Sequence, residues 1–264
     1  MLNLCGCFRS ALREDQSPDL SVMQDALSTP EVYSVLALDP AECIVGELRR
    51  KSELARKYIL DELNEFIENG HSGSVRFWFK PRSPDAPLIA KGEVLLINVD
   101  SIDFILQVLT ESRYRPFWDL DIVNNIHIRD ILSDSLDHTK EKARQVYNSF
   151  KGRFGQPGRD FVFNEYTCKI NENKAVFLIY SNPADECPPG FEPGSRGPFL
   201  RAHTFLGAYL VEKESNGVRI HFVNQTDIGG SLPDWISNLV LKKSPEKLSF
   251  ISNYISRLTN RNTH

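Results

Sequence analysis

Three short stretches in the C-terminal third of the chain decide its fold: Arg159-Asp160-Phe161, then Leu200-Arg201-Ala202-His203, then Gln225-Thr226-Asp227-Ile228-Gly229-Gly230-Ser231-Leu232-Pro233-Asp234-Trp235. The first two stretches open long runs in which apolar and polar residues alternate, which is the pattern of β-strands. The third stretch ends a strand, turns on two glycines and begins an amphipathic pattern typical of a helix. The last third of the chain is therefore expected to form strands followed by a helix.

The composition predicts a water-soluble globular protein. Of the 264 residues, 41% are hydrophobic and 25% are charged, which are ordinary values for that class. A net charge of −4 and a pI near 5.9 give no basic footprint for nucleic acid. No apolar run reaches the roughly 18 residues of a membrane span, and residues 1–8 are too short for the core of a signal peptide. We therefore expect a cytoplasmic protein without a nucleic-acid partner.

Five cysteines, an odd number, do not indicate a disulfide framework. Cys5 and Cys7 lie beside apolar residues near the N-terminus, and two interpretations stay open for them. Reversible S-acylation of these thiols would give a peripheral membrane tether. Alternatively, residues 1–38 are a plain extension with two free thiols. Two ligands do not complete a tetrahedral zinc site, so no metal is expected here.

The rest of the chain predicts an α+β fold. Asp39-Pro40-Ala41-Glu42 has the form of a helix start, and apolar residues then recur at helical spacing until Asn69-Gly70 supplies a stop. Short polar turns between the later runs favour one curved antiparallel sheet with long helices on one side. The expected strands are residues 75–80, 88–99, 122–129, 139–151, 160–170, 175–181, 199–212 and 218–226, with a short helix at 102–110 capped by Ser101 and a last helix at 232–258 that is interrupted at Ser244-Pro245.

Two of the expected strands carry aromatic and polar residues on one face. In residues 160–170, Phe161 and Phe163 share a face with Glu165 and Thr167. Such a mixture suits a partly polar cavity, although a face that simply packs, with its polar residues at the strand ends, would have the same pattern. In residues 199–212 the residues expected to share one face are Phe199, Arg201, His203, Phe205, Gly207 and Tyr209.

Motifs for catalysis are missing from the sequence. Gly70-His71-Ser72-Gly73-Ser74 lacks the final glycine of a nucleophile elbow, and the chain has neither a P-loop nor a G-x-G-x-x-G motif. The six histidines are scattered, with no pair at the i, i+4 spacing of a zinc site. We therefore expect a protein that is not an enzyme and that uses no cofactor.

With these residues in view, residues 41–260 resemble the START family, the steroidogenic-acute-regulatory-related lipid-transfer domains. Each shared motif is short, and their order and spacing carry the resemblance. Pro245 also falls where family members interrupt their last helix. The motifs are Arg115-x-x-Trp118-Asp119, Arg159-Asp160-Phe161, Pro188-Pro189, Arg201-Ala202, Gln225-x-Asp227-x-Gly229 and Leu232-Pro233-x-Trp235.

The resemblance implies a helix-grip fold over residues 39–264. In such a fold a curved antiparallel sheet wraps an apolar tunnel, and the last helix, which begins near Trp235, acts as the lid. It also implies that the domain carries one lipid between membranes without chemistry. A lipid-gated sensor that recruits a protein partner, with little transfer, is the alternative function.

The resemblance to phosphatidylcholine-transfer members implies a set of phospholipid contacts. Arg115 and Asp119 match a pair that contacts the lipid phosphate, although the pair would also serve to pin its own segment. Choline-caging rings of those members match Phe161 and His203, and a third falls near Tyr147 or Asn148. Leu109 and Phe205 replace a phosphate-contacting Tyr and Gln, so other phospholipids stay open. The lipid-facing residues expected on this basis are Arg115, Asp119, Tyr147, Phe161, Phe163, Glu165, His203, Phe205 and Trp235.

Glu165 stands where sterol-binding members carry an arginine, which argues against a sterol of that type. A carboxylate facing the lipid must be paired or hydrated, and Arg115, Arg201 and His203 are the partners that we expect. A cationic headgroup is the alternative partner. Residues 152–158 match a family loop at the tunnel mouth, and Arg153 and Phe154 are its expected membrane contacts. A solvated turn is the alternative for this loop.

Overall fold

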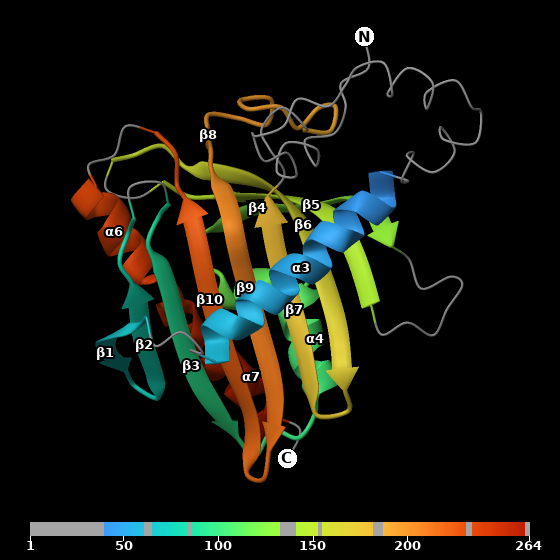
Figure 1. The fold of residues 1–264 in the computed structure, drawn as a ribbon, viewed down its shortest axis with the longest axis vertical. Coiled ribbons are helices and arrows are strands. Elements are labelled where there is room, and N and C mark those ends of the chain that lie inside the picture. The colour runs from blue at the N-terminus through green and yellow to red at the C-terminus, as the bar shows by residue number, and fades with distance from the viewer. Residues whose placement is uncertain are drawn as a thin grey trace, which may run out of the picture. The chain divides into compact units, whose positions relative to one another are not determined.

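The structure, a computed structural model, describes residues 40–60, 65–83, 86–132, 141–152, 155–181, 187–230 and 234–261. Its centre is one sheet with the strand order β1-β2-β3-β10-β9-β7-β6-β5-β4, in which the main-path neighbours pair antiparallel (Figure 1). The short strand β8 pairs parallel to β6. The strands are β1 (Ile67–Ser72), β2 (Val75–Lys80), β3 (Ile89–Ile97), β4 (Ile122–Leu132), β5 (Glu141–Phe150), β6 (Arg159–Asn171), β7 (Lys174–Ser181), β8 (Leu200–Arg201), β9 (His203–Glu214) and β10 (Gly217–Asp227).

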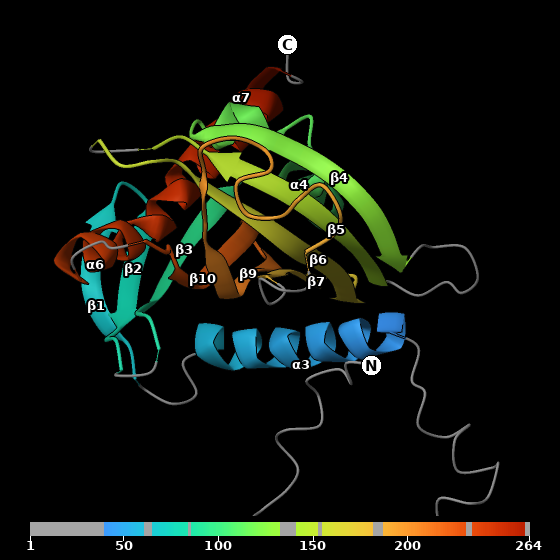
Figure 2. The ribbon, with the colours of Figure 1, turned by 90° about the horizontal axis from the view of Figure 1, so that it is seen from above.

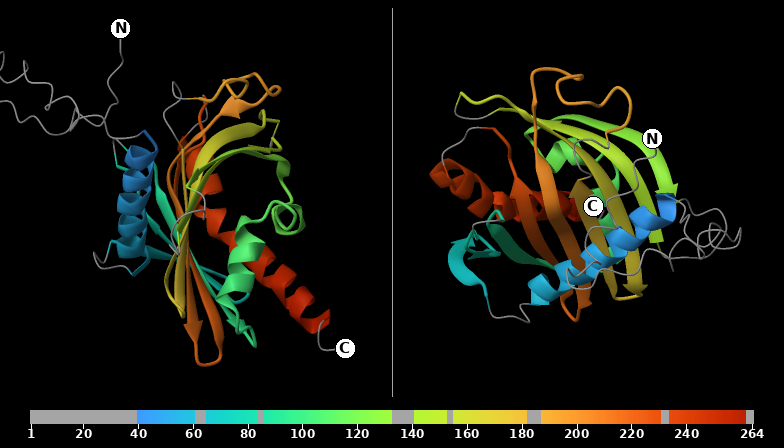
Figure 3. Two further views of the ribbon diagram at one scale, coloured as in Figure 1. Left: turned by 90° about the vertical axis from the view of Figure 1, so that its right-hand side faces the viewer. Right: turned by 45° about the horizontal axis from the view of Figure 1, so that its top comes forward.

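Helices cover both faces of this sheet. Figure 2 shows α3 on one face, called the outer face below, and α4 and α7 on the other, the inner face, toward which the sheet curves (Figure 3). The expectation of helices on one side is therefore wrong. The central strands explain it, because successive residues of β7 from Val176 to Ile179 are all buried and apolar, so both faces need cover. The helices are α3 (Pro40–Leu60), α4 (Ile102–Thr110), α5 (Arg115–Trp118), α6 (Asp234–Lys242), the 3₁₀ turn η3 (Ser244–Glu246) and α7 (Lys247–Arg261).

The first helix is shorter than the sequence predicted. Helix α3 ends at Leu60, and Ile67, which was expected on its apolar face, instead begins β1. Strand β1 forms a hairpin with β2, whose turn uses Gly73 at φ +59°. Phe66 and Ile67 fit a helical repeat equally well in sequence, so only the pairing of β1 with β2 decides their structure.

Local signals placed α4 and the break in the last helix correctly. The Ser101 hydroxyl accepts a hydrogen bond from the Phe104 backbone N–H at 3.1 Å, and α4 covers residues 102–110 as expected. Pro245 lies in η3, between α6 and α7. Gly92 of β3 lets this turn approach the sheet, because a Cβ at Gly92 would lie 2.6 Å from the Cβ of Pro245. The turn between α6 and α7 thus packs closely against β3.

Candidate functional site

The inner face of the sheet carries a continuous buried cluster rich in aromatic rings, called the inner cluster below. Phe161 and Phe163 stack with ring centroids 4.9 Å apart, and Tyr209 lies between Phe177 at 5.9 Å and Phe222 at 4.9 Å. Side chains of α4 and α7 complete the cluster, among them Ile105, Leu109, Leu248, Ile251 and Ile255. In the described part of the chain, packed side chains therefore occupy the region where the resemblance implies a tunnel.

Arg115 and Asp119 form a buried ion pair at one end of the inner cluster. The Arg115 Nε donates to Asp119 Oδ2 at 3.0 Å, one turn apart, and both residues are buried. The guanidinium lies over the Trp118 ring, 4.6 Å from its centroid, and the Trp118 indole N–H donates to the Val108 carbonyl at 3.0 Å. The predicted pairing of Arg115 with Asp119 is confirmed, and the segment is anchored to α4.

Lys247, the first residue of α7, makes a second contact to the same carboxylate. Its Nζ lies 3.2 Å from Asp119 Oδ2 and 5.0 Å from the centroid of the Phe150 ring. Burial disfavours the ionised form of Asp119, but the charges of Lys247 and Arg115 outweigh it and hold the pKa of Asp119 below its ordinary value. The three groups together carry one net positive charge, which suits them to pair with an anion.

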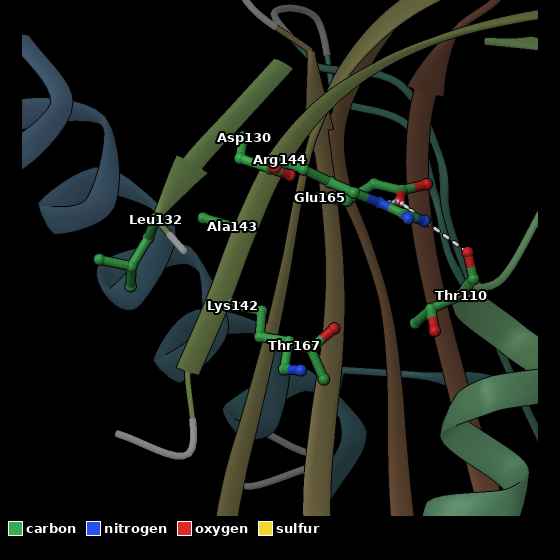
Figure 4. A pocket seen from close by; sticks show the side chains of 8 residues that line it. All are labelled: Thr110, Asp130, Leu132, Lys142, Ala143, Arg144, Glu165 and Thr167. Atoms are coloured by element: carbon green, nitrogen blue, oxygen red, sulfur yellow. Dashed lines mark hydrogen bonds and ion pairs between the residues drawn. The ribbon is translucent and has the colours of Figure 1, made fainter. Parts of the chain in front are cut away.

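Glu165 is paired with Arg144, the residue opposite it on β5, and not with any of the expected partners. The Arg144 Nε donates to Glu165 Oε2 at 2.8 Å, and its Nη2 bonds the carbonyl of Thr110 at the end of α4 (Figure 4). Arg115 pairs with Asp119 instead, and Arg201 pairs with Asp160 at 3.0 Å. The expected pairing of Glu165 is confirmed, but the expected partners are wrong, because the partner is set by the register between β5 and β6, which periodicity does not reveal.

A hollow of about 280 Å³ adjoins the Arg144–Glu165 pair at the β4 edge of the sheet. Figure 4 shows that its wall combines charged and apolar side chains from β4, β5 and β6 with Thr110 of α4. A second hollow of about 190 Å³ lies by the end of β10 and α6. Both are small compared with a two-chain lipid. The first is lined by Thr110, Asp130, Leu132, Lys142, Ala143, Arg144, Glu165 and Thr167.

Tyr147 lies on the outer face, so the structure does not bring it to the inner cluster with Phe161 and Phe163. Its ring packs against Phe191, with centroids 5.4 Å apart. Burial, followed by the nearby charge of Asp160, raises the pKa of Tyr147 to about 12. The next residue, Asn148, shares the inner face with Val146, because side chains alternate along β5. Of the two residues considered for this position, the inward one is Asn148.

His203 and Phe205 also lie on the opposite face from Tyr209. Thr204 pairs with Thr226 and Leu206 with Gln225, so Phe205 is the extra residue of a bulge in β9. The His203 ring lies 4.6 Å from the Phe205 ring and 6.4 Å from the Tyr180 ring, measured between centroids. Tyr180 packs on the outer face, against a buried cluster beneath α3 that includes Leu48 and Leu178. The prediction of one shared face is wrong because the bulge reverses the alternation.

Several predicted site residues lie outside the described structure. These are Cys5 and Cys7, and also Arg153 and Phe154 of the glycine-rich loop. Trp235 lies within α6, but its side chain is not described. The predicted residues that the structure does place on the inner side of the sheet are Arg115, Asp119, Phe161, Phe163 and Glu165.

The sequence did not predict three of the residues that lie on the inner side of the sheet. They are Lys247, Arg144 and Asn148. Lys247 follows Pro245, so a helix start at that position was predictable, but its contact with Asp119 spans 128 residues. Arg144 and Asn148 share the period-2 phase of Val146, and that phase was the signal available in the sequence.

Comparison with known families and structures identifies the fold. Human STARD10 shares 18% identity and a TM-score of 0.61, covering 76% of each chain. Human StAR-related lipid transfer protein 5 shares 14% identity and a TM-score of 0.63, covering 81% of this chain and 99% of its own. The lipid transfer and protein localization domain of human StarD13 shares 17% identity and a TM-score of 0.53, covering 74% and 93%. A search of curated protein sequences found no match.

These likenesses agree with the observed architecture, a large curved antiparallel sheet with a C-terminal helix across its inner face. The sequence model of the START domain matches residues 102–253, which is more than half of the chain. The matched segment begins with α4 and ends within α7. The chain therefore belongs to the START domain family.

Proposed function

We propose that this protein binds one phospholipid between the inner face of its sheet and α7, and transfers it between membranes. The observation that carries the proposal is the buried cluster of Arg115, Asp119 and Lys247 at the end of an apolar, aromatic inner face. Cations beside an apolar compartment match a molecule that is charged at one end and apolar over the rest. The name of one structural neighbour, human StAR-related lipid transfer protein 5, agrees with this function.

The apolar part of the proposal follows from the cost of moving a lipid through water. Two acyl chains hold roughly 30 methylene groups, each worth about 0.8 kcal/mol when it is removed from water. The inner face offers the acyl chains an apolar environment comparable to that of a bilayer. Its aromatic residues are Phe161, Phe163, Phe177 and Tyr209. The lipid is carried without chemical change.

Binding requires the inner cluster to open, since its side chains pack against one another. Helix α7 is the element whose movement would open it, because α7 is separated from α6 by η3 and packs on the sheet through Leu248, Ile251 and Ile255. Lipid chains would replace these side chains against the sheet, so the tunnel forms as α7 moves away. Such movements of packed helices take microseconds or longer.

The phosphate is assigned to Arg115 and Lys247. A guanidinium and an ammonium that share one carboxylate leave a net positive charge, and a phosphate oxygen can bond both cations. Phosphatidylcholine is one candidate cargo. However, its expected set of choline-caging rings is incomplete on the inner face, since Tyr147 and His203 lie on the outer side.

Membrane contact is assigned to the surface beside the glycine-rich loop at residues 152–158. Lys151, which precedes this loop, is exposed and bonds Asp121 through its backbone N–H at 2.8 Å. Phe117 and Leu120 nearby are each 64% exposed. Exposed apolar side chains beside a cation suit an anionic membrane surface. No described helix is long and apolar enough to cross a membrane.

The test is native mass spectrometry of protein purified from cells, followed by transfer of labelled phospholipid between vesicles. We expect a retained phospholipid mass and transfer that increases with protein concentration. Protein that retains no lipid and takes up none from vesicles would overturn the proposal. Binding with very slow release to acceptor vesicles would instead favour the lipid-gated sensor.

A further inference from the structure

The side chain of Asn148 is buried on the inner face without a hydrogen-bond partner among the described residues. It is 1% exposed, and both its Oδ1 and its Nδ2 lack a partner in the described part of the chain. Its register partner on β6 is Phe161, whose ring belongs to the inner cluster. Buried side-chain amides in folded proteins are nearly always bonded, so an open carboxamide at this position indicates a ligand group that completes it.

Asn148 lies close to the cations assigned to the phosphate. Two residues further along the same face of β5 is Phe150, whose ring centroid lies 5.0 Å from the Lys247 Nζ. Phe150 also meets Phe161 edge to face, with centroids 5.5 Å apart. Because residues two apart on a strand are separated by roughly 7 Å, a headgroup whose phosphate bonds Lys247 can reach Asn148 with its other polar end.

We propose that Asn148 selects the headgroup, favouring a phospholipid whose headgroup carries N–H donors over one with a quaternary ammonium. This inference rests on the proposed function. A carboxamide offers an acceptor oxygen and a donor nitrogen. The ammonium of an ethanolamine headgroup donates to Oδ1, and Nδ2 donates to a phosphate or ester oxygen of the same lipid. A trimethylammonium has no N–H to give, so Oδ1 stays buried and unpaired, which disfavours that lipid.

A second buried amide provides a matched contrast. Asn164 on β6 is also fully buried, but it lies on the outer side of the sheet and its Oδ1 accepts from Gln145 Nε2 at 3.3 Å. Asn164 therefore has a structural partner inside the protein, whereas Asn148 has none that is described. Replacing each by leucine separates a role in folding from a role toward the lipid.

The experiment loads the full chain from vesicles that contain phosphatidylethanolamine and phosphatidylcholine with identical acyl chains, and counts the bound lipids by native mass spectrometry. We expect the native protein to favour phosphatidylethanolamine by about tenfold, as one charge-assisted hydrogen bond provides. Asn148→Leu should reduce this preference to about twofold or less, without lowering the melting temperature. Asn148→Asp keeps an acceptor and should keep the preference.

The control Asn164→Leu should keep the preference and lower the melting temperature by several degrees, because the buried Gln145 Nε2 loses the acceptor Asn164 Oδ1. Equal loading of both lipids by the native protein would overturn the inference while leaving the proposed function in place. A full preference in Asn148→Leu, with a melting temperature lowered as in Asn164→Leu, would also overturn it and show a structural role. Loading of neither lipid would overturn the inference and the proposed function together.

Discussion

The ammonium of Lys247 lies 3.2 Å from the carboxylate of Asp119, although 128 residues separate them in the chain. This contact joins the first turn of α7 to the α5 segment, and the same Asp119 oxygen accepts from Arg115 at 3.0 Å. The buried carboxylate of Asp119 therefore links Lys247 of the terminal helix to Arg115, and these are the two cations assigned to the lipid phosphate. Opening of α7 and binding of the headgroup are expected to be coupled through it.

Lys247→Met should speed lipid release, because it removes this contact and keeps much of the apolar length of the side chain. We expect release to acceptor vesicles to be several-fold faster and the free energy of unfolding to fall by about 1 kcal/mol, since the lysine is partly exposed. The exposed Lys243 in the turn before η3 gives the control Lys243→Met. An unchanged release rate in Lys247→Met would remove the coupling role of this contact.

Arg115→Ala should reduce phospholipid transfer per folded molecule by about tenfold or more, because a bidentate donor to the phosphate is lost. The change also lowers the free energy of unfolding by roughly 2–3 kcal/mol. This loss is somewhat smaller than for a buried carboxylate without any partner, because Lys247 still pairs with Asp119. Urea unfolding gives the folded fraction, and vesicle transfer is then normalised to it. Equal transfer after this correction would assign Arg115 to pinning its own segment.

Leu120→Asp should weaken association with anionic vesicles by several-fold, because Leu120 is 64% exposed beside Lys151 at the assigned membrane surface. Leu54→Asp is the control, since Leu54 is also exposed but lies on α3, on the outer face. Vesicle flotation measures both. If the two variants bind vesicles equally well, the membrane surface lies elsewhere on the protein.

The lowered pKa of Glu93 predicts that the protein loses stability in acid. The contact with His221, whose Nδ1 lies 3.4 Å from Glu93 Oε2, outweighs the effect of burial and, with Arg76, lowers the pKa of Glu93 from 4.5 to about 2. A lowered carboxyl pKa stabilises the fold above pH ~4.5, and this contribution is lost as the pH falls toward ~2. We expect Glu93→Gln to cost about 1–2 kcal/mol at pH 6, allowing for solvent screening. The difference from the native protein, measured by urea unfolding, should disappear near pH 2, and a difference independent of pH would contradict the assignment.

Gly92→Ala should destabilise the protein by about 1–3 kcal/mol, because the new methyl group would meet Pro245 of η3 at 2.6 Å. Since η3 joins α6 to α7, the variant should also bind lipid less tightly. Gly46→Ala is the control, because nothing lies within 4 Å of a Cβ at this helical glycine, and alanine favours a helix by up to about 1 kcal/mol. Thermal unfolding of the two variants should therefore shift in opposite directions.

The sequence by itself determined the features that depend on neighbours in the chain. Alternation placed strands such as β2 (Val75–Lys80), a serine cap placed the start of α4, and Pro245 placed the break before α7. The pairing of Arg115 with Asp119 was implied by the family resemblance, and it too is local, because residues four apart on one helical turn are adjacent. Each of these features is fixed by contacts within a few residues.

Only the tertiary structure decided which face each side chain meets and which distant residue it pairs with. One extra residue in β9 put His203 and Phe205 on the outer side, and the register of β5 against β6 gave Glu165 the partner Arg144. The contact between Lys247 and Asp119 likewise joins elements distant in sequence. Bulges, register and helix docking depend on packing free energy summed over the whole sheet, which periodicity along one strand does not contain.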